Sequence, residues 1–342
     1  MTDAQWETLS NQGVAAAGVV YFLALLAYAV HWAALRDVPV RQAVAVGGGT
    51  IEEVPAEEVS DRTEMAGRLG VLLTGIGGLA HFIALLGRGL AADPNRVPWG
   101  NMYEFTLSGT FVVVALFLAT TNRWRLSWLG PIVVGFTLCV LLADVLWLYE
   151  PVAPLTEALE SYWLVIHVVS AIIATGAFTL GGITSILYLL KARSTSETGY
   201  LARLPELATL DRVAYRMHAF GFPVWTFGVL ISGPIWAHQA WSSYWNWDPK
   251  EVWAFITWVV YAAYLHARAT AGWRGRNAAL LALVGVATLW FNFIGINFYS
   301  TTSQHSYAEG PGDERSVVLR LAGPVEAAQE VRVVVGSDHA RT

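Results

Sequence analysis

Long apolar runs constrain the fold of this chain more than any other feature of its sequence. Eight runs are present, at about 14–35, 66–88, 104–121, 127–147, 163–190, 218–238, 251–270 and 278–300. Runs of about 20 residues are long enough to cross the hydrocarbon core of a bilayer as helices. A backbone exposed to lipid must satisfy its own hydrogen bonds, so each run is expected to be helical. The sequence therefore predicts an all-α, polytopic integral membrane protein with about eight transmembrane helices.

The composition agrees with a membrane location. Charged residues make up only 14% of the chain, whereas soluble domains carry roughly 25%. Residues 1–307 are predicted to form one membrane domain, followed by a polar extracytoplasmic tail at 308–342. The net charge of −5 is spread over the loops and says little about partners, and no nucleic-acid partner is expected.

The distribution of basic residues predicts how the helices are oriented. Connections that would share one side of the membrane hold 14 of the 21 Lys and Arg residues. These connections are 36–68, 122–127, 191–217 and 268–277. The opposite connections hold only Arg88, Arg96 and Lys250, with four more Arg in the tail. The positive-inside rule places the first set in the cytoplasm. The protein is therefore predicted to lie in the plasma membrane, with both termini and the connection before the seventh run on the extracytoplasmic side.

The stretch WSSYWNWDPKEVW (241–253) predicts the start of the seventh helix. Asp248 is a residue type favoured at the N-cap, and Pro249 is favoured as the first helical residue. Glu251 then stands at the third helical position. Asp248 and Glu251 together predict a capping box.

The tryptophans of this stretch have two interpretations. Tryptophan is enriched at membrane interfaces, so Trp241, Trp245 and Trp247 could belong to an aromatic belt. Belts scatter rings singly around the spans, however, whereas these three rings fall in one loop. If the stretch were helical, Trp241 and Trp245 would share a face. The second interpretation is a platform for a large planar ligand at the outer membrane surface.

Three histidines sharpen the second interpretation. His167 lies about one turn inside the outer end of the fifth run, and His305 lies just beyond the outer end of the eighth. Two imidazoles at the same level beside an aromatic platform could supply the axial ligands of a haem iron. His266, near the cytoplasmic end of the seventh run, is either part of a second, inner site or an interface residue. The chain has no Cys-x-x-Cys-His segment, so it is not itself a c-type cytochrome.

The segment WAHQAWSSYWNWDPKEVWAFITWVVYAAYLHAR (236–268) resembles the WWD domain of the CcsA/ResC family, which is called CcsB in some bacteria. Members of that family form the integral-membrane half of the System II cytochrome c synthase. The resemblance includes VPWGNMYEF (97–105), GFPVWTFGVLISGPIWA (221–237) and FNFIGINFYSTTSQHSY (291–307). It leaves out the acidic connection at 36–65 and the tail.

By position, the resemblance assigns a role to each candidate residue. Trp241, Trp245, Trp247 and Asp248 look like the core of the motif that meets haem. His167 and His305 match the two external histidines that ligate the haem iron in the family. His266 matches the histidine of an inner haem site, whose second ligand is thought to come from a partner subunit.

Two positions depart from the family pattern, both in loops. The family usually has Gly at the position of Ser242, and Gly-Leu-His at 303–305, where this chain has Ser-Gln-His. These changes put the shape of the loops in doubt, but they spare the residues that match the haem ligands.

The resemblance also implies a function. Haem b would be presented on the outer platform, where thiols of an apocytochrome c Cys-x-x-Cys-His segment add to its vinyl groups. The implied partners are a ResB/Ccs1-type membrane subunit, the apocytochrome c, a thioredoxin-like thiol reductant and the lipid bilayer. A haem transporter or handover module without ligation activity, or a structural subunit whose tryptophans form only a belt, remain as alternatives.

Overall fold

The computed structural model describes residues 1–35, 45–46, 50–51, 61–153, 161–196, 198–300 and 303. All of them belong to one unit, Met1–Ala308. The tail predicted at 308–342 lies outside the described residues. Within the described ranges the only strands are β1 (Ala45–Val46) and β2 (Thr50–Ile51), which pair antiparallel.

Each predicted apolar run corresponds to a helix or to a row of helical segments. The uninterrupted helices are α1 (Asp3–Leu35), α2 (Asp61–Leu90), α3 (Met102–Trp124), α5 (Tyr162–Arg193) and α9 (Pro249–Ala269). The other three runs each contain one π-helical segment. They are η1 (Ser127–Leu129), α4 (Gly130–Ala143) and η2 (Asp144–Leu148); α7 (Leu207–Trp225), η4 (Thr226–Ser232) and α8 (Gly233–Trp241); and α10 (Arg276–Trp290), η5 (Phe291–Gly295) and α11 (Ile296–Tyr299). A short helix, α6 (Gly199–Arg203), precedes α7.

Seven of these helical stretches are long and apolar enough to cross a membrane, among the residues that the structure describes. The remaining one, α9, does not meet the same measure of length and composition. Its sequence carries Glu251, His266 and Arg268, and Trp and Tyr at several positions where the other helices have aliphatic residues. The predicted all-α, multi-pass membrane fold is therefore confirmed, and α9 stays a predicted span.

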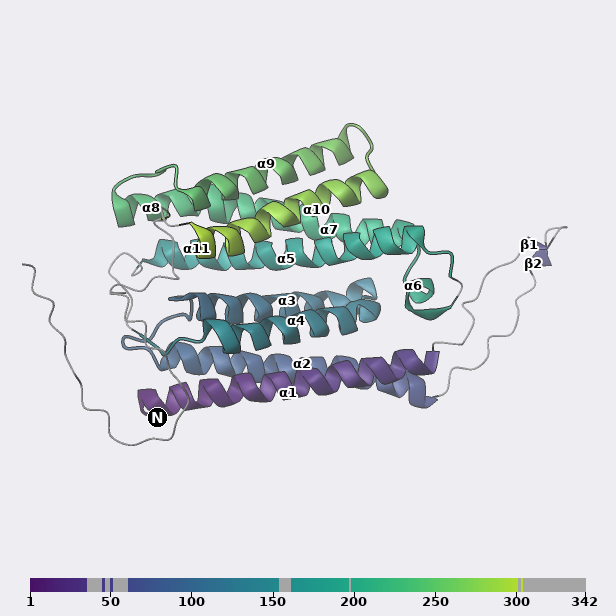
Figure 1. The fold of residues 1–342 in the computed structure, drawn as a ribbon, viewed down its shortest axis with the longest axis horizontal. Helices are drawn as coiled ribbons and strands as arrows, with labels where there is room; N and C mark the ends of the chain where they lie inside the picture. The colour runs from purple at the N-terminus through teal and green to yellow at the C-terminus, as the bar shows by residue number, and fades with distance from the viewer. Residues whose placement is uncertain are drawn as a thin grey trace, which may run out of the picture. The chain divides into compact units, whose positions relative to one another are not determined.

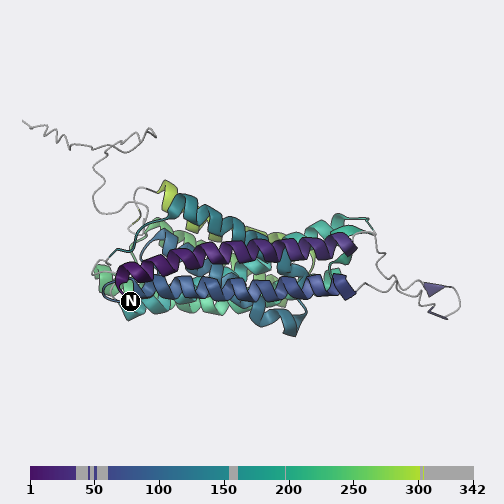
Figure 2. The ribbon, with the colours of Figure 1, turned by 90° about the horizontal axis from the view of Figure 1, so that it is seen from below.

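The helices pack as neighbours along their lengths. Helix α1 lies along α2, as Figure 2 shows, and α4 packs against α1 and α3. Helix α5 contacts α3 on one side and α7 and α10 on the other, and α9 packs on α10 (Figure 1). Because α5 is shared between the two groups, side chains along it reach residues from both halves of the bundle.

A buried ionic network holds the connection between α2 and α3. Arg88 Nε donates to Glu104 Oε1 at 2.9 Å, and Arg96 Nη1 donates to Glu104 Oε2 at 2.5 Å. The Gly100 backbone N–H donates to the same Oε2 at 2.7 Å. Burial of charges is tolerated only when they are paired and hydrogen-bonded. The network therefore fixes the first turn of α3, which carries Phe105 into the candidate site.

Candidate functional site

The tryptophan-rich stretch begins where α8 ends. Ser242 follows Trp241 with a φ of 57°, and its backbone N–H donates to the His238 carbonyl oxygen. This left-handed conformation closes helices and is favoured by glycine, because a side chain is strained there. Ser242 adopts this conformation, so the helix ends here without a glycine. The stretch from Ser242 to Asp248 is not helical, so Trp241 and Trp245 do not share a helix face.

The predicted capping box at the start of α9 is confirmed. Asp248 Oδ1 accepts from the Lys250 backbone N–H at 2.8 Å. In return, Glu251 Oε2 accepts from the Asp248 N–H at 3.1 Å and from the Asn246 N–H at 2.9 Å. The side chain of Ser303 also donates to Asp248 Oδ1, at 2.8 Å. The cap thus ties the tryptophan loop and the chain after α11 to one helix end.

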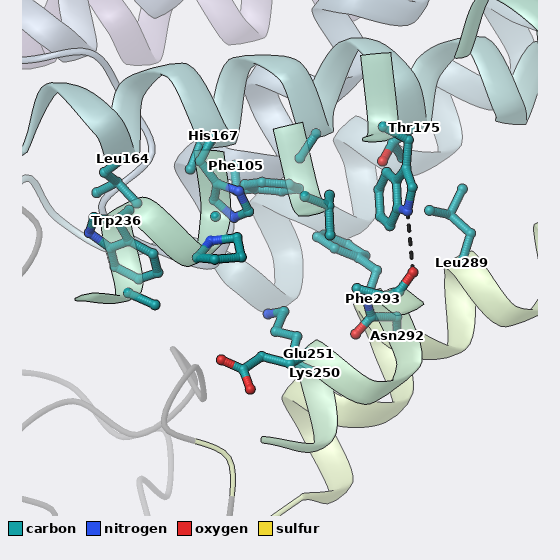
Figure 3. A pocket seen from close by; sticks show the side chains of 18 of the residues that line it. Phe105, Leu164, His167, Thr175, Trp236, Lys250, Glu251, Leu289, Asn292 and Phe293 are labelled. Atoms are coloured by element: carbon teal, nitrogen blue, oxygen red, sulfur yellow. Dashed lines mark hydrogen bonds between the residues drawn. The ribbon is translucent and has the colours of Figure 1, made fainter. Parts of the chain in front are cut away.

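A cavity opens beside this cap. It lies between α3, α5, η4, α8, α9 and η5, and its empty space of about 1050 Å³ includes open solvent. Aromatic and aliphatic side chains make most of its wall, including Phe105, Leu164, Trp236, Leu289 and Phe293 (Figure 3). Ligand pockets are mostly apolar, with a few polar groups that fix orientation. The lining therefore suits a flat, mainly apolar ligand.

His167 projects from α5 into this cavity (Figure 3). Its Nδ1 lies 2.7 Å from the carbonyl oxygen of Gly228, in the π-helical segment η4. A carbonyl oxygen only accepts, so Nδ1 carries the proton and the lone pair is on Nε2. Trp236 stacks on the imidazole, with ring centroids 5.9 Å apart and an angle of 13° between the planes. Metal-ligating histidines commonly donate their second ring N–H in this way, so His167 shares that feature with them.

The structure brings only some of the predicted tryptophans to the cavity. Trp245 lines the cavity wall, and its buried Nε1 has no hydrogen-bond partner within the described ranges. Trp241 meets the edge of Trp236 at 4.8 Å between centroids, so it supports the ring that stacks on His167. Trp247 is 78% exposed and touches Trp245 edge-on.

The other two predicted histidines are separate from this group. His305 lies outside the described residues, although Ser303, two positions earlier, is bonded to Asp248. His266 is exposed near the C-terminal end of α9, and its carbonyl oxygen accepts from the Thr270 hydroxyl. It stands 18 residues after Asp248 on one helix, which corresponds to roughly 27 Å at 1.5 Å per residue. His266 therefore belongs to the opposite end of α9 from the cavity.

Sequence reasoning missed most of the residues that line the cavity, and two of them stand out. Trp236 is 2% exposed and is the ring that contacts His167. Lys250 contributes an ammonium group to the cavity wall. Both lie in the segment 236–268 that carries the WWD resemblance, but nothing in the sequence indicated that their side chains face the cavity. The direction of each side chain depends on how α8 and α9 are rotated, which an apolar pattern does not specify.

Comparisons with known proteins identify related chains. Residues 99–303 match the sequence model of the family Cytochrome C assembly protein. The chain is 30% identical to the "Cytochrome c biogenesis protein CcsA" of Synechococcus sp. (strain JA-3-3Ab), over 89% of this chain and 95% of that protein. It is 36% identical to the protein of the same name from Guillardia theta, over 61% of this chain and 76% of that protein.

A solved structure shares the fold. "Cytochrome c Heme Lyase CcmF" superposes with a TM-score of 0.57 at 16% sequence identity, over 86% of this chain. The chain spans about half of that protein, 49% of its length. At this identity the likeness establishes the arrangement of helices alone. The family match covers the cavity, the cap and all of α3 to α11, and on that match and the relatives' identity the chain belongs to the cytochrome c assembly protein family.

Proposed function

We propose that the chain is the membrane haem-handling subunit of a holocytochrome c synthase. In this proposal the cavity at the outer end of α5 and α9 holds haem b, as substrate, for covalent attachment to apocytochrome c. One observation carries it: His167 points into an aromatic-walled cavity with its Nδ1 bonded to the Gly228 carbonyl oxygen. In this proposal Nε2 would be the atom that meets the metal ion of the ligand.

The residues of the cavity fit a haem group. Its aromatic wall offers the broad apolar contact that a porphyrin needs. The Nε1–H of Trp245 has no hydrogen-bond acceptor among the described residues. A polar atom of the ligand could accept this hydrogen bond. Trp241 would act through Trp236, and the exposed Trp247 would cover the outward edge of the ligand or meet the incoming apocytochrome.

The second axial ligand in this proposal is His305. Support comes from Ser303, which donates to Asp248 and so brings the chain to the cap two residues before His305. Asp248 would then have two tasks, because its carboxylate caps α9 and accepts from the segment that carries the ligand. His167 and His305 together would hold the haem iron from opposite faces.

The chain would position haem for the reaction and would not supply a nucleophile. Its single cysteine, Cys139, lies on α4 and lines no part of the cavity. Both thiols therefore come from the apocytochrome, and each S–H adds across one vinyl C=C to form one C–S and one C–H bond. The cavity holds haem still and orients it for this addition, which is catalysis by proximity. A thioredoxin-like reductant would keep the apocytochrome thiols reduced.

His266 would serve an inner site on the way to the outer cavity. Its imidazole is on an exposed position of α9, where a helix of another subunit has access to it. A ResB/Ccs1-type partner would supply the second inner ligand. The proposal keeps the orientation that the basic residues predict, with the cavity and both termini on the extracytoplasmic side of the plasma membrane.

The test is reconstitution of cytochrome c assembly. The chain, a ResB/Ccs1-type subunit and an apocytochrome c reporter are co-expressed, and the reporter is stained for haem after denaturing electrophoresis. Covalent haem is expected with the wild-type chain, and almost none with His167→Ala or with a reporter whose two cysteines are serines. If haem binds the chain but never becomes attached to the reporter, the chain is a handover module. If the purified chain binds no haem, the proposal fails.

A further inference from the structure

A basic cleft lies at the end of the bundle opposite the aromatic cavity. The C-terminal ends of α5 and α9 and the N-terminal end of α7 come together there (Figure 1). The cleft is lined from these three helices and from the connection between α9 and α10. Its charged lining residues are Asp211, Arg212, Arg268 and Arg274, so three arginine charges less one aspartate charge leave +2.

One of the arginines is fixed in the wall of the cleft. Arg268 Nη1 and Nη2 donate to the two carboxylate oxygens of Asp211, at 2.7 and 3.0 Å. The guanidinium also lies 4.5 Å from the centroid of the Tyr215 ring. The Gly275 N–H donates to Asp211 Oδ1 at 3.0 Å. Both oxygens of Asp211 are therefore engaged, and its charge is balanced by Arg268.

The other two arginines are available to a ligand. Arg212 lines the cleft from α7 and Arg274 lines it from the connection before α10, and both side chains are exposed. Neither forms a hydrogen bond or an ion pair in the described part of the chain. A guanidinium presents a planar fork of N–H donors that matches the oxygens of a phosphate. Two such groups in one cleft favour a phosphate-type anion as its occupant.

The cleft also lies at the ends of apolar spans. It is lined by the first residue of one candidate span and by the residue directly before another. Tyr215, which is 38% exposed, is a residue type enriched at the level of the lipid headgroups. Basic pockets between transmembrane helices at the membrane surface bind the headgroups of anionic lipids. The spans that meet here are Tyr162–Arg193, Leu207–Trp241 and Arg276–Tyr299.

The inner haem ligand proposed above lies on a different face of α9. His266 and Arg268 are two positions apart, which corresponds to about 200° around a helix. His266 accordingly does not line the cleft. An anion in the cleft and a haem at His266 would therefore occupy different faces of the helix.

We propose that this cleft binds the phosphate group of an anionic phospholipid. The lipid would belong to the leaflet at this end of the bundle, which the basic residues predict to be the cytoplasmic one. Arg212 and Arg274 would donate to the phosphate oxygens. The neutral pair of Arg268 and Asp211 would hold the wall in shape. The proposal is independent of haem binding at the outer cavity.

The test is a lipid titration of the purified full chain in detergent, read by native mass spectrometry. The probes are phosphatidylglycerol, which is anionic, and phosphatidylcholine, whose choline cation the two arginines would repel. We expect the wild type to bind phosphatidylglycerol more tightly by about fivefold for each free arginine, since a basic residue near an anionic membrane surface contributes about that factor. The double change Arg212→Gln and Arg274→Gln should remove this preference.

The matched control is Arg62→Gln with Arg193→Gln. It removes the same charge from exposed residues at the same end of the bundle, neither of which lines the cleft, and it should keep the wild-type preference. Both double variants should unfold at the wild-type temperature, because the four side chains are exposed.

Three results would overturn the proposal. The wild type could bind the two lipids equally, the cleft variant could keep the preference, or the control could lose as much of it as the cleft variant. A parallel titration with inorganic phosphate separates the two sources of a phosphate group. If inorganic phosphate displaces phosphatidylglycerol at equal concentration, the cleft is a site for a free anion and the assignment to a lipid is wrong.

Discussion

Replacing Gly233 with alanine should disturb His167 without removing any polar group. Gly233 is the first residue of α8, and a Cβ built there lies 3.0 Å from His167 Nδ1 and 3.1 Å from its Cε1. Ordinary contacts of a Cβ are about 3.4–4 Å. The imidazole must therefore move away by a few tenths of an ångström or more, which lengthens its 2.7 Å contact with the Gly228 carbonyl oxygen.

The size of the effect follows from that contact. Loss of the group that orients a metal-bound histidine typically weakens metal affinity 10–100-fold. Because Gly233→Ala displaces the imidazole rather than deleting its partner, we expect haem affinity to fall about tenfold. The fold should remain intact, because Ala is the better residue in a helix by about 1 kcal/mol.

The assay is a haem titration of the purified chain, with thermal unfolding measured on the same samples. Gly75→Ala is the matched control, because it adds the same methyl group within α2, where a Cβ meets nothing within 4 Å. The control should bind haem as the wild type does. If Gly233→Ala also binds haem at wild-type affinity while folded, then the contact between His167 and Gly228 does not orient a ligand.

Three further outcomes follow. Trp245→Ala should weaken haem binding roughly tenfold, because it removes one large, half-buried ring from the cavity wall. Trp247→Ala should weaken it by less, because Trp247 is 78% exposed. Equal losses in the titration would contradict this. His266→Ala should lower the haem content of cell membranes, but it should not change the affinity of the purified chain for haem added at the outer cavity. If haem content and cytochrome c assembly are both unchanged, His266 is an interface residue. Glu104→Gln should destabilise the fold by about 3–5 kcal/mol, because Arg88 and Arg96 would lose the carboxylate that they share and Arg88 would keep only its 3.8 Å ion pair with Glu7. Unfolding in denaturant at the wild-type midpoint would count against the network.

The helices could be predicted because their signal is local. Eight apolar runs of sufficient length predict helices wherever the bilayer is the solvent, and all eight correspond to helical segments. The start of α9 could also be predicted from the sequence, because Asp248, Pro249 and Glu251 interact within one helical turn. The polar and aromatic residues of α9 keep it below the length and composition measure for a span, although the sequence predicts one there.

The site could be predicted only in part, because it depends on contacts between distant segments. His167 was found from its depth in the fifth run, but the carbonyl group that holds it comes from Gly228, 61 residues later. That carbonyl belongs to a π-helical segment, and such segments leave no clear periodic pattern. Similarly, Trp236 meets His167 through the packing of α8 on α5, and no spacing within α8 reveals it.

The central claim is that His167 and His305 grip one haem iron from opposite faces, and electron paramagnetic resonance of the ferric haem complex tests it most directly. The chain is purified with His266→Ala, so that the inner site contributes no signal, and loaded with one equivalent of haem. Two imidazole ligands predict a low-spin spectrum, and either His167→Ala or His305→Ala should convert it to high-spin, with added imidazole restoring the low-spin form. A high-spin spectrum before either change, or a low-spin spectrum that survives both, would contradict the account.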